Sequence, residues 1–305
     1  MSVIISIVAE MLHLALMVLA PLVVAGIMDW LDARLAGREG PPILLPWRNL
    51  VRLSRKTAVV PDSASRVLSL APAISLGTTF TAAALVPSFT LGMALAPLAD
   101  GLVVASLLSM ARVAGSLGAL DTGTAASGVA AQHGSALAIL AEPALLLFVF
   151  SLALMGGGFN LDLIIGQQRE GMLLPAAASA LALTSLLTLV FAEASDTSAG
   201  LDLDYSGVDL AVSHATVWLR RLVWIDLLGA LFLPIGMAAP DEGLMQWGIG
   251  LLCWVAKLAT TVICLCCSRT LLGRVARRDM ADLAGIAVLL ALLAAIMVLA
   301  SEGTV

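Results

Sequence analysis

Long apolar stretches, separated by short polar segments, dominate this chain. Stretches of about 20 residues, the length of a helix that crosses the hydrocarbon of a membrane, occur near residues 3–28, 67–90, 97–120, 130–156, 172–194, 217–238, 244–268 and 282–301. The composition supports this interpretation, with 60% hydrophobic and 12% charged residues, whereas soluble domains carry about 25% charged residues. We therefore predict an all-α polytopic membrane protein with eight spans, forming a single membrane domain over residues 1–305.

The distribution of basic residues predicts the orientation of these spans. Fourteen of the sixteen lysine and arginine residues fall in alternate loop regions, at 29–66, 112–129, 195–221 and 269–281. Cytoplasmic loops of membrane proteins carry such an excess, so we expect these four loops to be cytoplasmic and both termini to lie on the outer, periplasmic side. The predicted location is the cell inner (plasma) membrane. The net charge of -5 does not indicate nucleic-acid binding.

The first of these loops contains a basic amphipathic segment, "REGPPILLPWRNLVRLSRK". Apolar and basic residues from Trp47 onward fall on different faces of a helix, which predicts an amphipathic helix lying at the membrane interface. Topology-setting charge with an aromatic anchor is one explanation of this segment. The other is a docking surface for a cytoplasmic partner, whose candidate residues are Arg38, Trp47, Arg48, Arg52, Arg55 and Lys56.

Several ionisable side chains lie inside the predicted spans: Glu10, His13, Arg112, Glu142, Glu193, Asp226 and Lys257. Such groups are costly in hydrocarbon and usually line protein-facing or hydrated pathways. A structural ion pair between helices explains any single one of them, whereas the set favours a proton or ion path. Lys257 is near the middle of its span and requires a carboxylate partner or a lowered pKa.

An acidic segment, "FAEASDTSAGLDLDYSG", follows the fifth predicted span and holds Glu193, Asp196, Asp202 and Asp204 in an otherwise charge-poor chain. Other short motifs carry little weight. "LDTG" at 120–123 lacks the second loop that an aspartic protease needs, and "GGG" at 156–158 has no P-loop lysine. The three histidines and four cysteines form no metal-ligand spacing or catalytic triad, so we expect no metal site and no self-sufficient enzyme.

Five segments occur in the order found in a known family: "REGPPILLPWRNLVRLSRKTAVVPDSAS" (38–65), "GALDTGTAASGVAAQHGSALAILAEPALLL" (118–147), "DYSG" (204–207), "LRRLVWIDLLGALFLPIG" (219–236) and "WVAKLATT" (254–261). Together they resemble the membrane subunit of group 4 energy-converting hydrogenases, the formate hydrogenlyase subunit 4 type, which is homologous to the H (ND1-like) subunit of complex I. The resemblance covers nearly the whole chain.

This resemblance implies a subunit that docks a cytoplasmic redox module and couples electron transfer to proton or sodium translocation. The implied path uses Glu142, Glu193, Asp204 and Lys257, and the neighbouring Asp196, Asp202 and Asp226 complete the set of candidates. The implied partners are hydrophilic hydrogenase-like or complex I-like subunits, antiporter-like membrane subunits and the lipid membrane. Nickel-iron and iron-sulfur sites are expected on partner subunits, no cofactor is expected in this chain, and a quinone is the least supported of the implied ligands.

The chain departs from the family pattern in two places. Residues 191–207 replace an acidic loop about twice as long, and the family's Phe-Glu-Asn-Ser at the end of the seventh span is replaced by Cys267, Ser268, Arg269 and Thr270. Both changes affect the surface that faces the redox module. A structural membrane anchor that has lost redox coupling is therefore the alternative function. A free-standing carrier is a third hypothesis, disfavoured by the resemblance and by the lack of an internal repeat.

Overall fold

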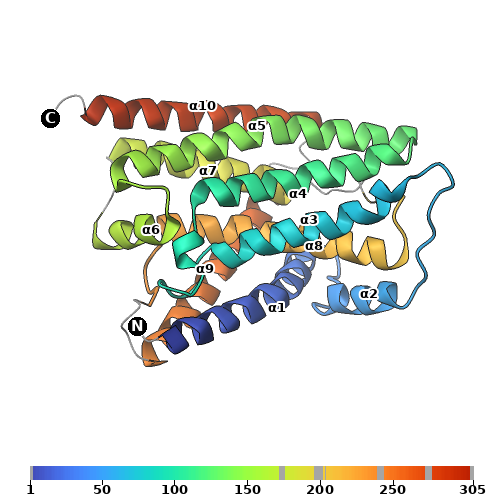
Figure 1. The fold of residues 1–305 in the computed structure, drawn as a ribbon, viewed down its shortest axis with the longest axis horizontal. Helices are drawn as coiled ribbons and strands as arrows, with labels where there is room; N and C mark the ends of the chain where they lie inside the picture. Colours follow the sequence, from blue (N-terminus) through green and yellow to red (C-terminus); the bar gives the residue numbers. More distant parts are fainter. Residues whose placement is uncertain are drawn as a thin grey trace.

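The computed structural model describes residues 3–171, 176–195, 202, 204–238, 244–271 and 277–302. Eight long helices cross one bundle (Figure 1): α1 (Val3–Leu35), α3 (Arg66–Leu85), α4 (Gly101–Asp121), α5 (Ala125–Gly156), α7 (Ala176–Ser195), α8 (Gly207–Phe232), α9 (Leu244–Leu271) and α10 (Arg277–Glu302). Within the described ranges there is no strand, only two isolated β-bridges. The predicted all-α fold is confirmed, and each predicted apolar run corresponds to one long helix.

Seven of these helices are long and apolar enough to cross a membrane, and α8 is the exception among the eight. This helix carries four charged residues, Asp209, Arg220, Arg221 and Asp226. The structure accounts for them because α8 packs against α1, α3 and α7, and most side chains between Leu219 and Leu231 are buried. Charged groups inside a membrane are tolerated where protein, not lipid, surrounds them.

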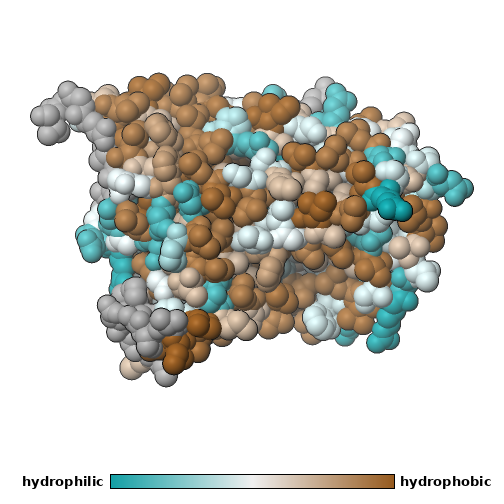
Figure 2. Space-filling view, viewed as in Figure 1, coloured by the Kyte–Doolittle hydropathy of each residue, from teal (hydrophilic) through white to brown (hydrophobic). Residues whose placement is uncertain are grey.

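The two ends of the bundle differ in the segments that they hold. α1 begins and α10 ends at the same end of the bundle, as an even number of crossings requires (Figure 1). The opposite end holds α2 (Leu45–Ser54) and the turn between α4 and α5. The loop after α2 and the α4–α5 turn therefore lie together at one end, where Ser63 donates a hydrogen bond to the Thr122 carbonyl. Which end faces the cytoplasm stays a prediction. Figure 2 shows hydrophobic residues through the middle of the bundle and many of the hydrophilic ones toward its two ends.

Helix α2 confirms the amphipathic helix predicted in the first basic loop. Pro46 lies in its first turn. Backbone N–H groups in the first turn have no acceptor within the helix, so the N–H that proline lacks costs no hydrogen bond there. Pro46 and Leu53 are buried, and the helix packs against α8 and α1. The chain enters α2 so close to α1 that a Cβ atom on Gly26 would overlap the carbonyl of Ile43. Glycine at position 26 therefore permits this contact.

A short helix, α6 (Leu161–Glu170), lies between two predicted spans, where the apolar runs predict no helix. The Asn160 side chain accepts a hydrogen bond from the Leu163 N–H and so caps its first turn, and Leu161, Ile164 and Ile165 form its buried face. Asp162 accepts a hydrogen bond from the Gly92 N–H at 2.8 Å, and burial raises the pKa of this carboxyl. The capping asparagine and the apolar spacing were signals that could have predicted this helix.

Candidate functional site

Charged side chains from three helices meet in the interior of the bundle. Glu193 of α7 forms ion pairs with Arg112 of α4 and with Arg220 of α8, whose Nε atom lies 3.5 Å from Glu193 Oε2. All three side chains are buried, none more than 8% exposed. Burial of such charges is tolerated because each partner replaces part of the hydration that the other has lost. We call this group the Glu193 centre.

Glu193 and Arg112 are among the ionisable residues of the predicted spans, whereas the charge pattern predicts Arg220 in a cytoplasmic loop. In the structure Arg220 lies about three and a half turns inside α8, on a face that also buries Thr216, Leu219 and Val223. Those four positions follow the i, i+3, i+4, i+7 spacing of one helix face. This spacing was the signal in the sequence that Arg220 faces the protein interior.

A second buried polar group lies farther along α8. Asp226 Oδ1 accepts a hydrogen bond of 2.9 Å from Trp254 Nε1 on α9, and Lys257, three residues after Trp254, lines the same cavity of about 10 Å³ as Asp226 and Ser88. That volume is close to the space of one water molecule. Asp226 Oδ2 is buried and has no hydrogen-bond partner within the described residues. The structure thus brings Asp226 and Lys257 to one small polar cavity, the Asp226 centre.

Helix α1 is linked to this cavity through Ser88. The Ser88 hydroxyl lies 2.8 Å from His13 Nδ1, and His13 Nε2 lies 2.9 Å from the carbonyl oxygen of Ala83. Because a carbonyl only accepts hydrogen bonds, Nε2 carries a proton, and in the neutral ring Nδ1 accepts from Ser88. Glu10, nearly one turn earlier in α1, accepts from the Leu95 N–H at 3.2 Å. Polar side chains of α8 and α9 therefore line this cavity together with Ser88, which is bonded to His13 of α1.

Asp204 lies at the other end of α8, in the segment before the helix. It accepts hydrogen bonds from Thr122 Oγ1 at 2.7 Å and from Thr124 Oγ1 at 2.9 Å. These bonds, led by that of Thr122, stabilise the carboxylate and lower the pKa of Asp204. Asp204 therefore fastens the start of α8 to the turn between α4 and α5.

The three residues after Asp204 make similar contacts. Tyr205 is buried against α4, where a Cβ atom on Gly118 would overlap its hydroxyl. The Ser206 hydroxyl accepts from the Val59 N–H at 2.6 Å and donates to the Val59 carbonyl at 3.0 Å. Gly207 has a φ of +55° and lies against the backbone of the loop that follows α2. The segment 204–207 thus joins α8 to α4, to the α4–α5 turn and to the loop after α2.

The other candidate acids do not join these groups. Glu142 is half-buried on α5 and forms no hydrogen bond or ion pair within the part of the chain that the structure describes. Asp202 lies 3.1 Å from His214 Nε2, and Asp196 lies outside the described residues. The acidic segment is consequently divided between a buried carboxylate at Glu193 and carboxylates near the surface at Asp202 and Asp204.

The basic face of α2 is accessible. Trp47, Arg48, Val51, Arg52 and Arg55 line an open hollow of about 440 Å³. The remaining two docking candidates, Arg38 and Lys56, are also exposed. This surface combines an aromatic ring with several guanidinium groups at the end of the bundle where the basic loops gather.

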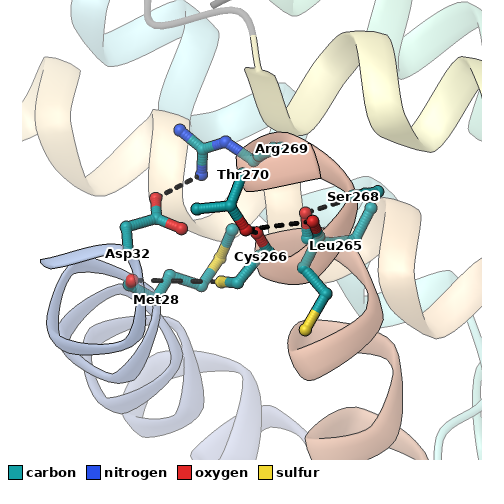
Figure 3. Close-up of polar contacts among 8 residues, drawn as sticks. Met28, Asp32, Leu265, Cys266, Ser268, Arg269 and Thr270 are labelled. Atoms are coloured by element: carbon teal, nitrogen blue, oxygen red, sulfur yellow. Dashed lines mark hydrogen bonds and ion pairs between the residues drawn. The ribbon is translucent and has the colours of Figure 1, made fainter. Parts of the chain in front are cut away.

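The end of α9 carries Arg269, in the segment where the resemblance implies an acid. Arg269 Nη1 lies 3.0 Å from Asp32 Oδ2 of α1 (Figure 3). On the same two helices, Cys266 Sγ lies 3.9 Å from the Met28 carbonyl oxygen. Arg269 therefore has an acidic partner in this chain, and the pair fastens α1 to α9.

No cluster of three or more histidine, cysteine, aspartate or glutamate side chains that could hold a metal ion occurs among the described residues. The arrangement therefore offers buried ion pairs and a water-sized polar cavity. These are groups that can bind, release or reorganise charge within an apolar bundle.

Comparison with known proteins shows the family. The model of the NADH dehydrogenase family matches residues 8–300. Formate hydrogenlyase subunit 4 of Escherichia coli (strain K12) is 29% identical over 73% of this chain and 76% of its own length. Hydrogenase-4 component C of the same organism is 29% identical over 81% of this chain and 79% of its own length.

A solved structure has the same fold. One chain of the membrane-bound sulfane sulfur reductase, an archaeal respiratory membrane complex, superposes with a TM-score of 0.73 at 18% identity, covering 98% of this chain and 100% of the other. The family match over nearly the whole length, together with these relatives, shows that this chain belongs to the NADH dehydrogenase family of membrane subunits, which is found in complex I-like and hydrogenase-type respiratory complexes.

Proposed function

We propose that this chain docks a cytoplasmic redox module to the cell inner membrane and couples electron transfer in that module to translocation of protons or sodium ions. The observation that carries the proposal is the pair of buried centres on α8, one at Arg220 and one at Asp226. An apolar bundle needs neither for its stability, because apolar side chains of similar volume often serve at least as well as a buried ion pair.

The two centres share one rigid element. Arg220 and Asp226 are six residues apart on α8, a rise of about 9 Å along the axis. A movement of α8 changes the surroundings of both at once. A buried carboxylate that loses its cationic partner must take up another cation, such as a proton or a sodium ion, because an uncompensated buried charge is very unfavourable. Displacement of α8 in one step and its return in the next would therefore bind and release an ion.

The surface at the basic end of the bundle provides the link to the redox module. The exposed basic face of α2 is suited to an acidic protein surface, and the segment 204–207 connects the loop after α2 directly to the start of α8. The names of the two bacterial relatives, a formate hydrogenlyase subunit and a hydrogenase-4 component, support hydrogenase-like hydrophilic subunits as partners. Antiporter-like membrane subunits complete the proposed assembly.

The test begins with the native complex. The chain is affinity-tagged, purified in mild detergent, and its partners are identified by mass spectrometry. The complex is then placed in liposomes, and proton and sodium uptake driven by electron transfer is measured. Lys257→Met and Glu193→Gln should retain the partners and abolish ion uptake, whereas Glu39→Gln, which changes an exposed acid outside the spans, should retain both. Wild-type ion uptake by Lys257→Met would show that the Asp226 centre is outside the path.

A structural anchor without ion coupling is the second candidate function. The observation that favours it is Asp204, whose carboxylate is held by Thr122 and Thr124 in the segment where the resemblance implies a proton path. In that case the wild-type complex would contain redox subunits and transfer electrons without any ion uptake. Reconstitution of the wild-type complex therefore separates the two candidates.

A further inference from the structure

A groove lined by apolar side chains runs between α1 and α9, apart from both buried centres. Its cavity volume is about 490 Å³, and its walls include Leu16, Val23 and Ile27 of α1 and Leu258, Val262 and Ile263 of α9. Along α1 it extends from Leu16 to Leu31, about 22 Å at 1.5 Å per residue. One leaflet of hydrocarbon is about 15 Å deep, half of a core of about 30 Å. The groove is thus long enough for a chain that spans one leaflet.

One end of the groove is amphipathic. Trp30 lines it, and the Arg34 guanidinium lies 5.5 Å from the centre of the Trp30 ring. Arg34 is exposed, whereas Asp32 and Arg269, on the same ends of α1 and α9, pair with each other. Tryptophan is enriched at the membrane interface, and arginine near this level attracts anionic lipid headgroups.

We propose that this groove binds one acyl chain of an anionic phospholipid, whose phosphate lies beside Arg34. Two helices that form part of the membrane-spanning bundle border the groove, and side chains such as Leu19 and Val255 on its rim are exposed. A transmembrane helix does not fit inside it, because about 22 Å of a helix 10 Å wide occupies about 1,700 Å³. An isoprenoid quinone tail would fill the apolar part but would leave Arg34 without an anionic partner from the ligand.

The site adjoins the Asp226 centre through one residue. Trp254 lines the groove with its ring and donates its Nε1–H to Asp226. An acyl chain in the groove would hold this ring in place and separate Asp226 from the open groove. This effect on Asp226 rests on the proposed function, whereas the lipid site does not depend on it.

Native mass spectrometry of the purified complex tests the site. The complex is exchanged into detergent micelles with either dioleoyl phosphatidylglycerol or dioleoyl phosphatidylcholine, and retained lipid is counted. Ala259→Trp fills the groove, and Ala256→Trp, at an exposed position of α9 outside it, is the matched control. Arg34→Gln removes the headgroup contact, and Arg66→Gln changes another exposed arginine.

Wild type and both controls should retain one phosphatidylglycerol with at least a fivefold preference over phosphatidylcholine. Ala259→Trp should lose the lipid, and Arg34→Gln should lose the preference. Equal retention by Ala259→Trp and wild type would overturn the proposal, as would recovery of an isoprenoid quinone in place of phospholipid. A cross-link from Ala259→Cys to a partner subunit in a lipid-free complex would also overturn it.

A second measurement covers the case in which Ala259→Trp does not fold. Phosphatidylglycerol with brominated acyl chains should quench the fluorescence of Trp30 at the groove, so Trp30→Phe should reduce the quenched fraction. An unchanged fraction contradicts the site. Lipid retention is measured without electron transfer, so its failure is distinguishable from failure of the proposed ion translocation.

Discussion

Arg112 of α4 and Glu193 of α7 form an ion pair inside the bundle, with side chains 6% and 1% exposed. Together with Arg220, they hold three helices at one point, although the three residues are far apart in the sequence. Their contact combines a stabilising role with a possible role in ion movement, and the two roles can be measured separately.

Replacement of Glu193 by glutamine should lower the free energy of unfolding by about 3–5 kcal/mol, the usual effect of removing one member of a buried pair. Thermal unfolding of the detergent-solubilised protein measures this loss. Glu142→Gln is the matched control, because no ion pair of Glu142 occurs in the described part of the chain, and it should change stability by no more than about 0.5 kcal/mol. Equal effects of the two substitutions would contradict a special role for the Glu193 centre.

The hydrogen bond from Trp254 to Asp226 should also be measurable. Trp254→Phe keeps the aromatic ring but leaves a buried carboxylate oxygen without its donor, which should destabilise the protein by about 1–3 kcal/mol. Trp47→Phe changes a half-exposed ring on α2 and should have little effect on unfolding. If both variants unfold at the wild-type temperature, the hydrogen bond contributes nothing to stability.

The lowered pKa of Asp204 predicts that the stability of the protein depends on pH. The hydrogen bonds from Thr122 and its neighbours lower the pKa of Asp204 in the folded protein. The ionised Asp204 therefore contributes to folding stability. This stability is fully present above the unfolded-state pKa of about 3.9 and is lost as pH falls through the lower folded-state pKa. Wild type should be more stable than Asp204→Asn at pH 6, and the difference should shrink below about pH 4. Asp62→Asn, which removes an exposed carboxylate of the loop between α2 and α3, controls for lost charge. A pH-independent difference would refute the assignment.

The acidic and the basic residue of the Asp32–Arg269 ion pair should be exchangeable between the two positions. Its side chains are 30% and 23% exposed, so its coupling energy should be about 0.5–1 kcal/mol, near the upper end for exposed pairs. Asp32→Arg and Arg269→Glu should each lower the unfolding temperature, and the double variant should recover part of the loss. A double-mutant cycle measures the coupling, and strictly additive effects would show that the contact is not energetically coupled.

Much of the fold followed from local sequence patterns, whereas some site residues did not. The α2 helix followed from its basic and apolar spacing, but α6 was missed because ten residues are too short to stand out as an apolar run. Arg220 was assigned to a loop because its charge resembles a topology signal. Its helical spacing indicates an inward face, but only the packing of α8 against α7 shows that it lies beside Glu193.

The sequence by itself determined the number and order of the long helices, because membrane hydrocarbon selects a composition and length that each segment displays locally. Tertiary structure decided which charges meet. Glu193 pairs with residues of two other helices. Asp226 of α8 accepts a hydrogen bond from Trp254 of α9. Such contacts depend on how helices turn toward each other during packing, which no local pattern of residues specifies.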